Sequence, residues 1–215
     1  APRDHEENAY TTAPVWNAIT KLGEKIERSG VELEFDSTSG YLPAVLKALA
    51  IPIESQTLAF TQTSLQAKHI ARDNPRAIFF TDDVAVAWIR GAERLELAVQ
   101  DPKQGTIFYT LPQTRSAKPA FTRDDKCLAC HLSWETRAVP GPFVQTVFPR
   151  RSEDEYANGF TVDHRVPLAE RWGGWYVTGQ RVPTSMGNIP LLQPTMPEHG
   201  PERVPAKRSL SGLFE

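Results

Sequence analysis

Both cysteines of this 215-residue chain lie within one short run that ends in a histidine. The run is Cys127-Leu128-Ala129-Cys130-His131. Two thiols at this spacing can form thioether bonds to the two vinyl groups of a haem, and the histidine that follows can bind the iron axially. The C-x-x-C-H run is the attachment signature of c-type haem. The sequence therefore predicts one covalently attached haem c per chain.

We expect a short helix to present this motif. Thr122 and Asp125 have the residue types of a capping box, which predicts a helix that begins near Arg123. Residues three and four positions apart share one face of a helix. Both thiols and the imidazole would then project from the same turn, with the sulfurs along one edge of the macrocycle and the imidazole beneath its centre.

Other chemistry is open to the same residues. A redox-active C-x-x-C pair follows a strand in a βαβ unit, but residues 123–126 are charged and do not predict a strand. A zinc site needs two further ligands. His131 and His164 could complete a Cys₂His₂ set, although their spacing is not that of a zinc finger. A chance match on a helix is the remaining alternative.

The second axial ligand of the iron is not fixed by the motif. His164 is the first candidate, and Met186 is the alternative because the Gly187-Asn188 turn that follows could present its thioether. The remaining candidates are His5, His69, His199 and Met196. An iron with an open sixth position is also consistent with the sequence.

Aromatic residues and paired glycines follow His164 closely. Trp172 and Trp175 flank Gly173 and Gly174, and glycine permits close approach of a backbone to another group. One interpretation is a wall of the haem pocket, with both tryptophans in contact with the cofactor. The other is an ordinary buried hairpin.

Length and composition indicate a globular protein. Hydrophobic residues make up 40% and charged residues 23% of the chain, and the formal net charge is −2. This charge gives no reason to expect nucleic-acid binding, and no run of 18 apolar residues predicts a transmembrane segment. We expect one haem-binding domain over 1–215, with peripheral extended segments at 1–13 and 193–215.

The hydrophobic pattern predicts an α+β fold. Apolar residues at helical spacing predict helices over 15–28, ended by Ser29-Gly30, and over 41–49. Alternation predicts a strand over 31–35. Runs separated by turn residues predict an antiparallel meander over 77–81, 84–89, 94–99 and 106–111, with further strands at 144–148 and 175–182. This plan, with a short haem-bearing helix and a loop-rich C-terminal part, differs from the small all-helical cytochrome c fold.

Four stretches of sequence carry a resemblance to a known group. They are SGYLPAVLKAL at 39–49, PRAIFFTDDVAVAWIRG at 75–91, CLACH at 127–131 and RWGGWYVTG at 171–179. In these the chain resembles monohaem c-type cytochromes from an uncharacterised group of bacterial exported proteins. The resemblance implies a periplasmic or otherwise exported protein, and Ala1 is consistent with a mature form left after signal-peptide removal. Members of the group often carry histidine where this chain has Ser185.

Electron transfer between exported redox partners is the function that we expect. A six-coordinate haem can change charge without a catalytic acid or base, so an electron carrier is favoured over an enzyme. The alternative is a haem enzyme or gas sensor with an open or displaceable sixth position, acting on peroxide or nitrogen oxides. His69, His164 or Glu170 would then serve as the distal acid–base group. A third possibility is a haem that only stabilises the fold.

Basic residues precede the motif. They could bind haem propionates or steer an acidic redox partner, although most such clusters are simply solvated. They are Arg115, Lys118, Arg123 and Lys126.

Overall fold

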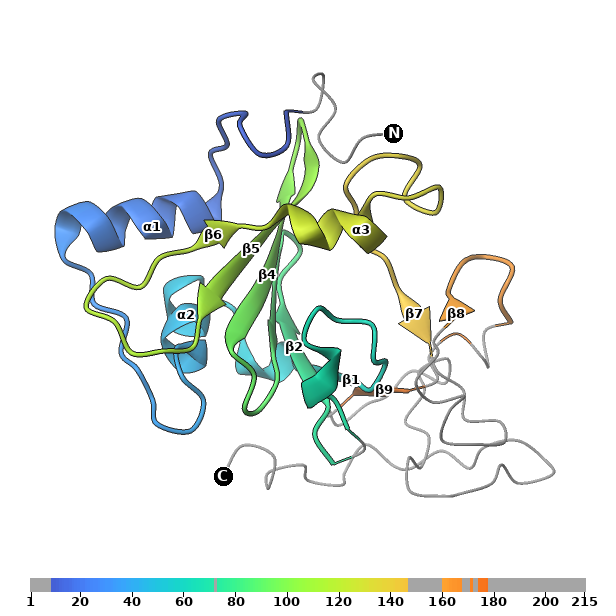
Figure 1. Cartoon of the computed structure of the whole chain (residues 1–215), viewed down its shortest axis with the longest axis horizontal. Helices are drawn as coiled ribbons and strands as arrows, with labels where there is room; N and C mark the ends of the chain where they lie inside the picture. Colours follow the sequence, from blue (N-terminus) through green and yellow to red (C-terminus); the bar gives the residue numbers. More distant parts are fainter. Residues whose placement is uncertain (1–8, 72, 147–159, 168–170, 172–173, 178–215) are drawn as a thin grey trace. The chain divides into compact units, whose positions relative to one another are not determined.

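The structure is a computed structural model (Figure 1). The chain divides into two compact units. It describes residues 9–71, 73–146, 160–167, 171 and 174–177. The first unit comprises Ala1–Ile53, Phe79–Trp88 and Ala92–Phe143, and the second comprises Glu54–Ile78, Ile89–Gly91 and Val144–Glu215. A single haem-binding domain over 1–215 stays a prediction.

The first helix of the first unit, α1 (Ala18–Ser29), confirms the helix expected from the apolar spacing. Its N-cap is Asn17, whose side chain accepts hydrogen bonds from the backbone N–H groups of Ile19 and Thr20. Gly30 ends the helix in the left-handed conformation, with a φ of 63°. The helix begins three residues later than the pattern predicts because Asn17 supplies the cap.

The second expected helix is present and the strand before it is not. Helix α2 spans Leu42–Ala48. Residues 31–35 form no strand, and only Leu33 among them is buried. The nearest ladder contact is the isolated bridge between Asp36 and Gly40. Alternating residues predict a strand only where a neighbouring strand can pair with it, so the prediction was wrong here.

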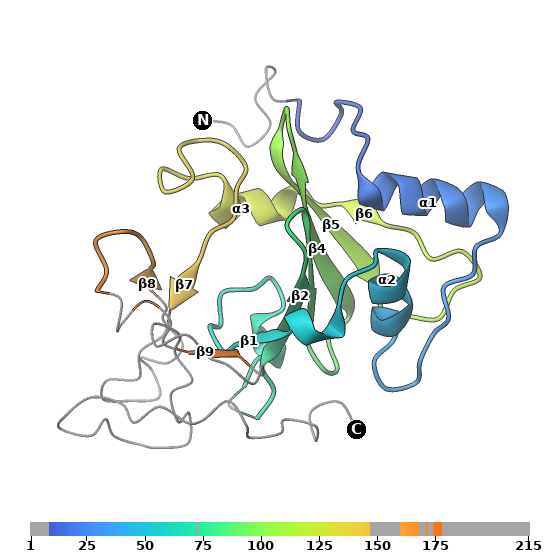
Figure 2. The same ribbon diagram turned by 180° about the vertical axis from the view of Figure 1, so that it is seen from behind.

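The α+β class is confirmed, because β3, β4 and β5 are strands of the predicted antiparallel meander. The strand predicted over 77–81 is present as β2 (Arg76–Phe80). The pattern does not predict β6, which extends the sheet in the order β6-β5-β4-β3 (Figures 1 and 2 label β4, β5 and β6). Their bounds are β3 Val84–Trp88, β4 Arg94–Asp101, β5 Gly105–Pro112 and β6 Thr122–Arg123. The β4–β5 hairpin is the longest pair, in register from Asp101↔Gly105 to Arg94↔Pro112. The protein therefore does not have the small all-helical cytochrome fold.

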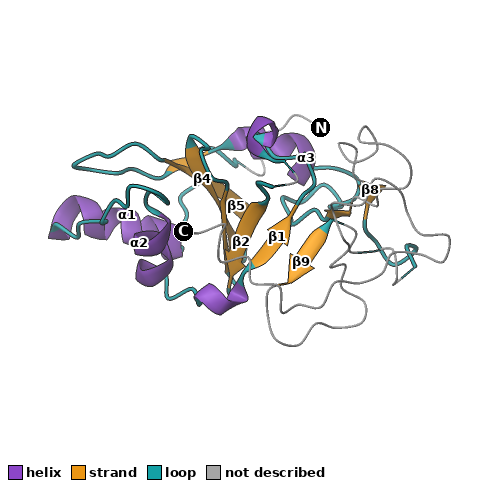
Figure 3. Cartoon of the chain, turned by 90° about the horizontal axis from the view of Figure 1, so that it is seen from below, coloured by secondary structure: helices purple, strands orange, loops and turns teal. Residues whose placement is uncertain are grey.

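Strand β5 is buried along almost its whole length because both of its faces are covered. Successive residues point to opposite faces of a strand. The Tyr109 hydroxyl accepts a hydrogen bond from Asn17 Nδ2 at 2.9 Å, so one face is turned toward α1. Phe108 on the other face packs against His131. Helices α1 and α2 lie to the same side of the sheet (Figure 3).

The motif lies on a short helical segment that begins after β6. A 3₁₀ turn, η3 (Asp125–Cys127), leads into α3 (Leu128–His131). The cap is Asp124, whose carboxylate accepts from the backbone N–H of Lys126 at 3.0 Å. The predicted capping box on Thr122 was wrong because that residue pairs with Thr110 in the sheet.

In the second unit, strand β1 (Thr57–Ala59) pairs with β2 (Arg76–Phe80), of which Arg76–Ile78 belong to this unit, and with β9 (Trp175–Val177). Strand β9 confirms the start of the strand expected at 175–182, whose remainder lies outside the described residues. A separate pair joins β7 (Gln145–Thr146) to β8 (Phe160–Thr161). The unit also contains the 3₁₀ turn η2 (Ala67–His69), and η1 (Ile53–Ser55) begins at its boundary.

Two further findings concern the ends of the chain and the membrane. Tyr10 is 1% exposed, so the segment 1–13, expected to be peripheral, contributes a core side chain. The segment 193–215 lies outside the described residues. Among the residues that are described, no helix has the length and apolar character needed to cross a membrane.

Candidate functional site

The two thiols of the motif lie in different environments. Cys127 is partly buried at the end of η3, whereas Cys130 is exposed on α3. Burial raises the pKa of the Cys127 thiol to about 12, and the nearby carboxylates of Asp124 and Glu96 add to the effect. Cys127 is therefore a thiol at neutral pH. A redox-active C-x-x-C pair needs a thiolate, so this environment does not favour the redox interpretation.

The strand context also differs from that of a redox-active motif, although not as the sequence predicts. A strand does precede the motif, because Thr122–Arg123 form β6. This strand pairs antiparallel with β5, whereas a thioredoxin-like motif follows a parallel strand of a βαβ unit.

The imidazole of His131 is held by a backbone carbonyl. Its Nδ1 lies 2.9 Å from the carbonyl oxygen of Gly141. A carbonyl oxygen only accepts, so Nδ1 must carry the proton and donate it to this bond. In the neutral ring the lone pair is then on Nε2, the nitrogen that can bind a metal.

Two aromatic rings pack against the same imidazole. The ring centroids of Phe108 and His131 are 4.5 Å apart with an interplanar angle of 43°. Phe143 meets His131 edge-on at 6.3 Å and 87°. These contacts, together with the bond to Gly141, restrict rotation of the imidazole about its side-chain bonds.

The backbone of Phe108 is held by two hydrogen bonds, one of which involves Asp124, the residue that follows β6. Its N–H donates to the Tyr10 hydroxyl at 2.8 Å, and its carbonyl accepts from the N–H of Asp124 at 3.0 Å. The Arg123 guanidinium lies 4.4 Å from the centroid of the Tyr10 ring. Burial raises the pKa of Tyr10 to about 12, against opposing contributions from Phe108 and Arg123.

These residues fit a covalently attached haem. An axial histidine typically donates its second ring N–H to a carbonyl or carboxylate, which fixes the tautomer and raises the basicity of the binding nitrogen. The bond from His131 to Gly141 has this form. Cys127 and Cys130 are free thiols, the form that adds to vinyl groups. The site would thus consist of two thioether positions and one oriented imidazole.

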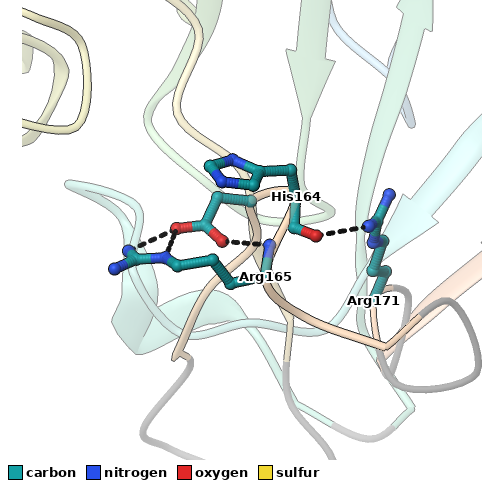
Figure 4. Close-up of polar contacts among 4 residues, drawn as sticks. His164, Arg165 and Arg171 are labelled. Carbon is teal, nitrogen blue, oxygen red and sulfur yellow. Dashed lines mark hydrogen bonds and ion pairs between the residues drawn. The ribbon is translucent and has the colours of Figure 1, made fainter.

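The first candidate for the second ligand, His164, lies on a loop of the second unit with an exposed side chain (Figure 4). The Asp163 carboxylate accepts from Arg165 through both its backbone N–H and its guanidinium, which lowers the Asp163 pKa to about 2. Arg171 Nη2 donates to the backbone carbonyl of His164 at 3.1 Å. These bonds fix the backbone on both sides of the imidazole and leave the ring out of the network drawn in Figure 4.

The other predicted site residues fall into two groups. Trp175 belongs to β9 of the second unit, where its indole N–H donates to the carbonyl of Gln145 at 2.7 Å. His69 ends η2 of the same unit, and its carbonyl accepts from Asn74. Trp172, Met186 and Glu170 lie outside the described residues. The structure therefore brings together the motif and its support, and the pocket residues stay predictions.

Two of the basic residues before the motif have structural contacts. Arg123 donates to the carbonyl of Ala13 and to the side chain of Gln104. Arg115 donates to the carbonyl of Phe35 and lies over its ring. The remaining two, Lys118 and Lys126, are exposed.

The described part of the chain contains no cluster of three or more His, Cys, Asp or Glu side chains arranged as metal ligands. Comparisons with protein-family models, with curated proteins and with solved structures return no match to this chain. The function proposed below therefore depends on the geometry of these residues.

Sequence reasoning did not find Gly141, Phe108 or Tyr10. Gly141 acts through its carbonyl oxygen, which every residue possesses, so no residue type marks it. Phe108 lies on the opposite face of β5 from its sequence neighbours Ile107 and Tyr109. An apolar residue on that face was the available signal that a further element covers it.

Proposed function

We propose that this protein is a c-type cytochrome that carries one haem c and transfers electrons between exported redox partners. The observation that carries the proposal is the hydrogen bond from His131 Nδ1 to the Gly141 carbonyl. His131 lies four residues after Cys127 and one residue after Cys130. This bond places the lone pair of the neutral ring on Nε2, as an iron ligand requires.

The chain's own residues would act in three ways. Cys127 and Cys130 would hold the cofactor through thioether bonds, and His131 would bind the iron through Nε2. Bound haem would supply an iron that alternates between the ferric and ferrous states. Phe108 and Phe143 both pack against the imidazole, so the ligand has little freedom to move when the charge changes.

This restraint supports electron transfer over catalysis. A carrier works best when its ligands keep one geometry in both oxidation states, and three separate contacts restrain His131. Location outside the cytoplasmic membrane and an exported protein as redox partner are parts of the same proposal, carried by the motif and by the resemblance in sequence.

The proposal is tested by producing the full chain in a bacterium that attaches haem c during export. Denaturing mass spectrometry should find the added mass of one haem, and the ferrous absorption spectrum should have the form given by two thioether bonds. The double variant Cys127→Ala, Cys130→Ala should carry no covalent haem. Ser133→Ala is the matched control, because its hydroxyl is buried on the adjoining loop without a hydrogen-bond partner among the described residues.

Carbon monoxide separates the two proposed classes of haem protein. A closed six-coordinate carrier should show no prompt change in the Soret band of the ferrous protein. A prompt shift would instead favour the enzyme or gas sensor with an open sixth position. A wild-type protein without covalent haem would contradict both proposals.

A further inference from the structure

The turn between β4 and β5 has a conformation that favours glycine. Asp101 accepts hydrogen bonds from the backbone N–H groups of Lys103 and Gln104, each at 2.9 Å, and so closes the turn. Gly105 follows with a φ of +75° and pairs with Asp101. Three residues, 102–104, separate this pair, and the left-handed conformation of the residue directly after them favours glycine.

A second constraint acts on the same glycine and comes from the loop after the haem motif. A Cβ atom added to Gly105 would lie 2.2 Å from the Pro140 carbonyl oxygen and 2.9 Å from Val139 Cγ1. The Pro140 oxygen accepts a hydrogen bond from the backbone N–H of Thr106 at 2.7 Å. The absence of a side chain at Gly105 therefore allows the loop to dock on the start of β5.

The docked loop presents the acceptor of His131. Gly141 follows Pro140 directly, and its N–H donates to the His131 carbonyl at 3.0 Å. Its own carbonyl accepts from His131 Nδ1 at 2.9 Å. These two bonds join residues 131 and 141 at both the backbone and the side chain. The bond between Thr106 and Pro140 consequently determines where the acceptor for the imidazole lies.

The loop between His131 and Gly141 combines internal hydrogen bonds with strained backbone. The Thr136 hydroxyl accepts a hydrogen bond from the backbone N–H of Ser133 and donates one to the Ser133 carbonyl. The chain then turns through Arg137 and Ala138, which have positive φ values of 56° and 58°. Positive φ is unfavourable for residues other than glycine. A loop that contains two such residues needs contacts outside itself to keep this conformation, and the Thr106–Pro140 bond is one.

We propose that Gly105 is a positioning residue for the axial ligand His131, acting through Pro140 and Gly141. The expected effect of Gly105 on the reduction potential rests on the proposed haem function. The expected effect of Gly105 on the position of the His131 imidazole does not. A stronger bond from Nδ1 makes Nε2 more basic and favours ferric iron. Displacing the Gly141 carbonyl should therefore shift the reduction potential to more positive values.

The variant Gly105→Ala tests this position, and Gly91→Ala is its matched control. Gly91 has a φ of +77°, close to that of Gly105, but a Cβ there would meet no atom within 4 Å. Both variants incur the cost of alanine at positive φ, so both should lose stability. Only Gly105→Ala should push the Pro140 carbonyl away.

Two readouts follow the imidazole. Exchange of the His131 Nδ1 proton with solvent, measured by NMR on ¹⁵N-labelled protein, should be about tenfold faster in Gly105→Ala and unchanged in Gly91→Ala, because one hydrogen bond is lost. The reduction potential of the haem-bearing protein should become more positive in the first variant alone. Equal exchange rates or equal potentials in the two variants would overturn the proposal.

If Gly105→Ala does not fold, hydrogen exchange of the wild-type protein still tests the proposal. If the loop docks as a unit, the amides of Thr106 and Gly141 should be protected from hydrogen exchange and should open with one common rate. A freely exchanging Gly141 amide beside a protected Thr106 amide would overturn the proposal. Absence of covalent haem would contradict the proposed function separately, because both exchange measurements need no haem.

Discussion

At the scale of single residues, the orientation of His131 depends on packing as well as on hydrogen bonding. Phe108 is 7% exposed and lies against the imidazole. We expect Phe108→Ala to lower the free energy of unfolding by about 3 kcal/mol, from lost burial and the cavity left behind. Urea unfolding measures this, with Phe80→Ala as control because Phe80 is 45% exposed. Equal losses in the two variants would contradict the role assigned to Phe108.

Tyr10 should make the stability of the first unit depend on pH in the alkaline range. Its pKa is raised from 10.0 to about 12 in the folded protein, chiefly by burial. The folded state thus favours the protonated phenol, so its contribution is complete below pH 10 and is lost as pH rises toward 12. A shift of this size corresponds to a stability change on the order of 2 kcal/mol.

The check on Tyr10 is urea unfolding of the wild type and Tyr10→Phe across this pH range. The variant should be less stable at neutral pH, because the Phe108 N–H loses its acceptor. It should also lose less stability between pH 10 and 12 than the wild type does. Parallel pH profiles for the two proteins would contradict the raised pKa.

At the scale of elements, α1 is joined to the sheet by its own cap. Asn17 accepts from two backbone N–H groups of the helix and donates to Tyr109 of β5. We expect Asn17→Ala to cost about 2 kcal/mol, since it removes both the cap and the bond between elements. Tyr109→Phe removes only the second and should cost about 1 kcal/mol. Thermal unfolding of both variants measures the difference, and equal losses would show that the cap contributes nothing.

Elements with a strong periodic pattern were predictable from the sequence. Helix α1 and the strands β3 and β4 follow the apolar spacing because each buries one face against a neighbour. Strand β5 was predictable as an apolar run between turn residues, and it is buried on both faces. The stretch 31–35 has a similar alternation and forms no strand, since the pattern carries no information about a pairing partner. Strand β1 is three residues long and fully buried, too short to show a period.

The candidate site was predictable only in its residue types. The cysteine and histidine positions follow from C-x-x-C-H, but the cap at Asp124 required knowledge that Thr122 pairs in the sheet. The carbonyl of Gly141 and the close approach at Gly105 depend on how a loop docks on a strand far from it in sequence. Long-range backbone contacts of this kind have no local signature.

At the scale of the whole molecule, the proposed haem attachment and the proposed second axial ligand involve different parts of the chain. The two cysteines, His131 and the residues that hold its imidazole all belong to the first unit. His164, the first candidate for the second axial ligand, belongs to the second, and the alternative, Met186, lies outside the described residues. A change in a candidate ligand should therefore alter the spectrum of the iron without preventing covalent attachment.

Spectroscopy of three proteins tests this separation: the wild type, His164→Ala and Met186→Ala. All three should contain one covalent haem by mass spectrometry, because Cys127 and Cys130 are unchanged. If His164 is the ligand, the ferric wild type should lack the weak long-wavelength band of methionine-ligated haem, and only His164→Ala should become high-spin and bind carbon monoxide promptly. The band in the wild type and its loss in Met186→Ala would assign methionine instead. A low-spin spectrum in both variants would contradict both ligands and direct the search to the other histidines of the chain.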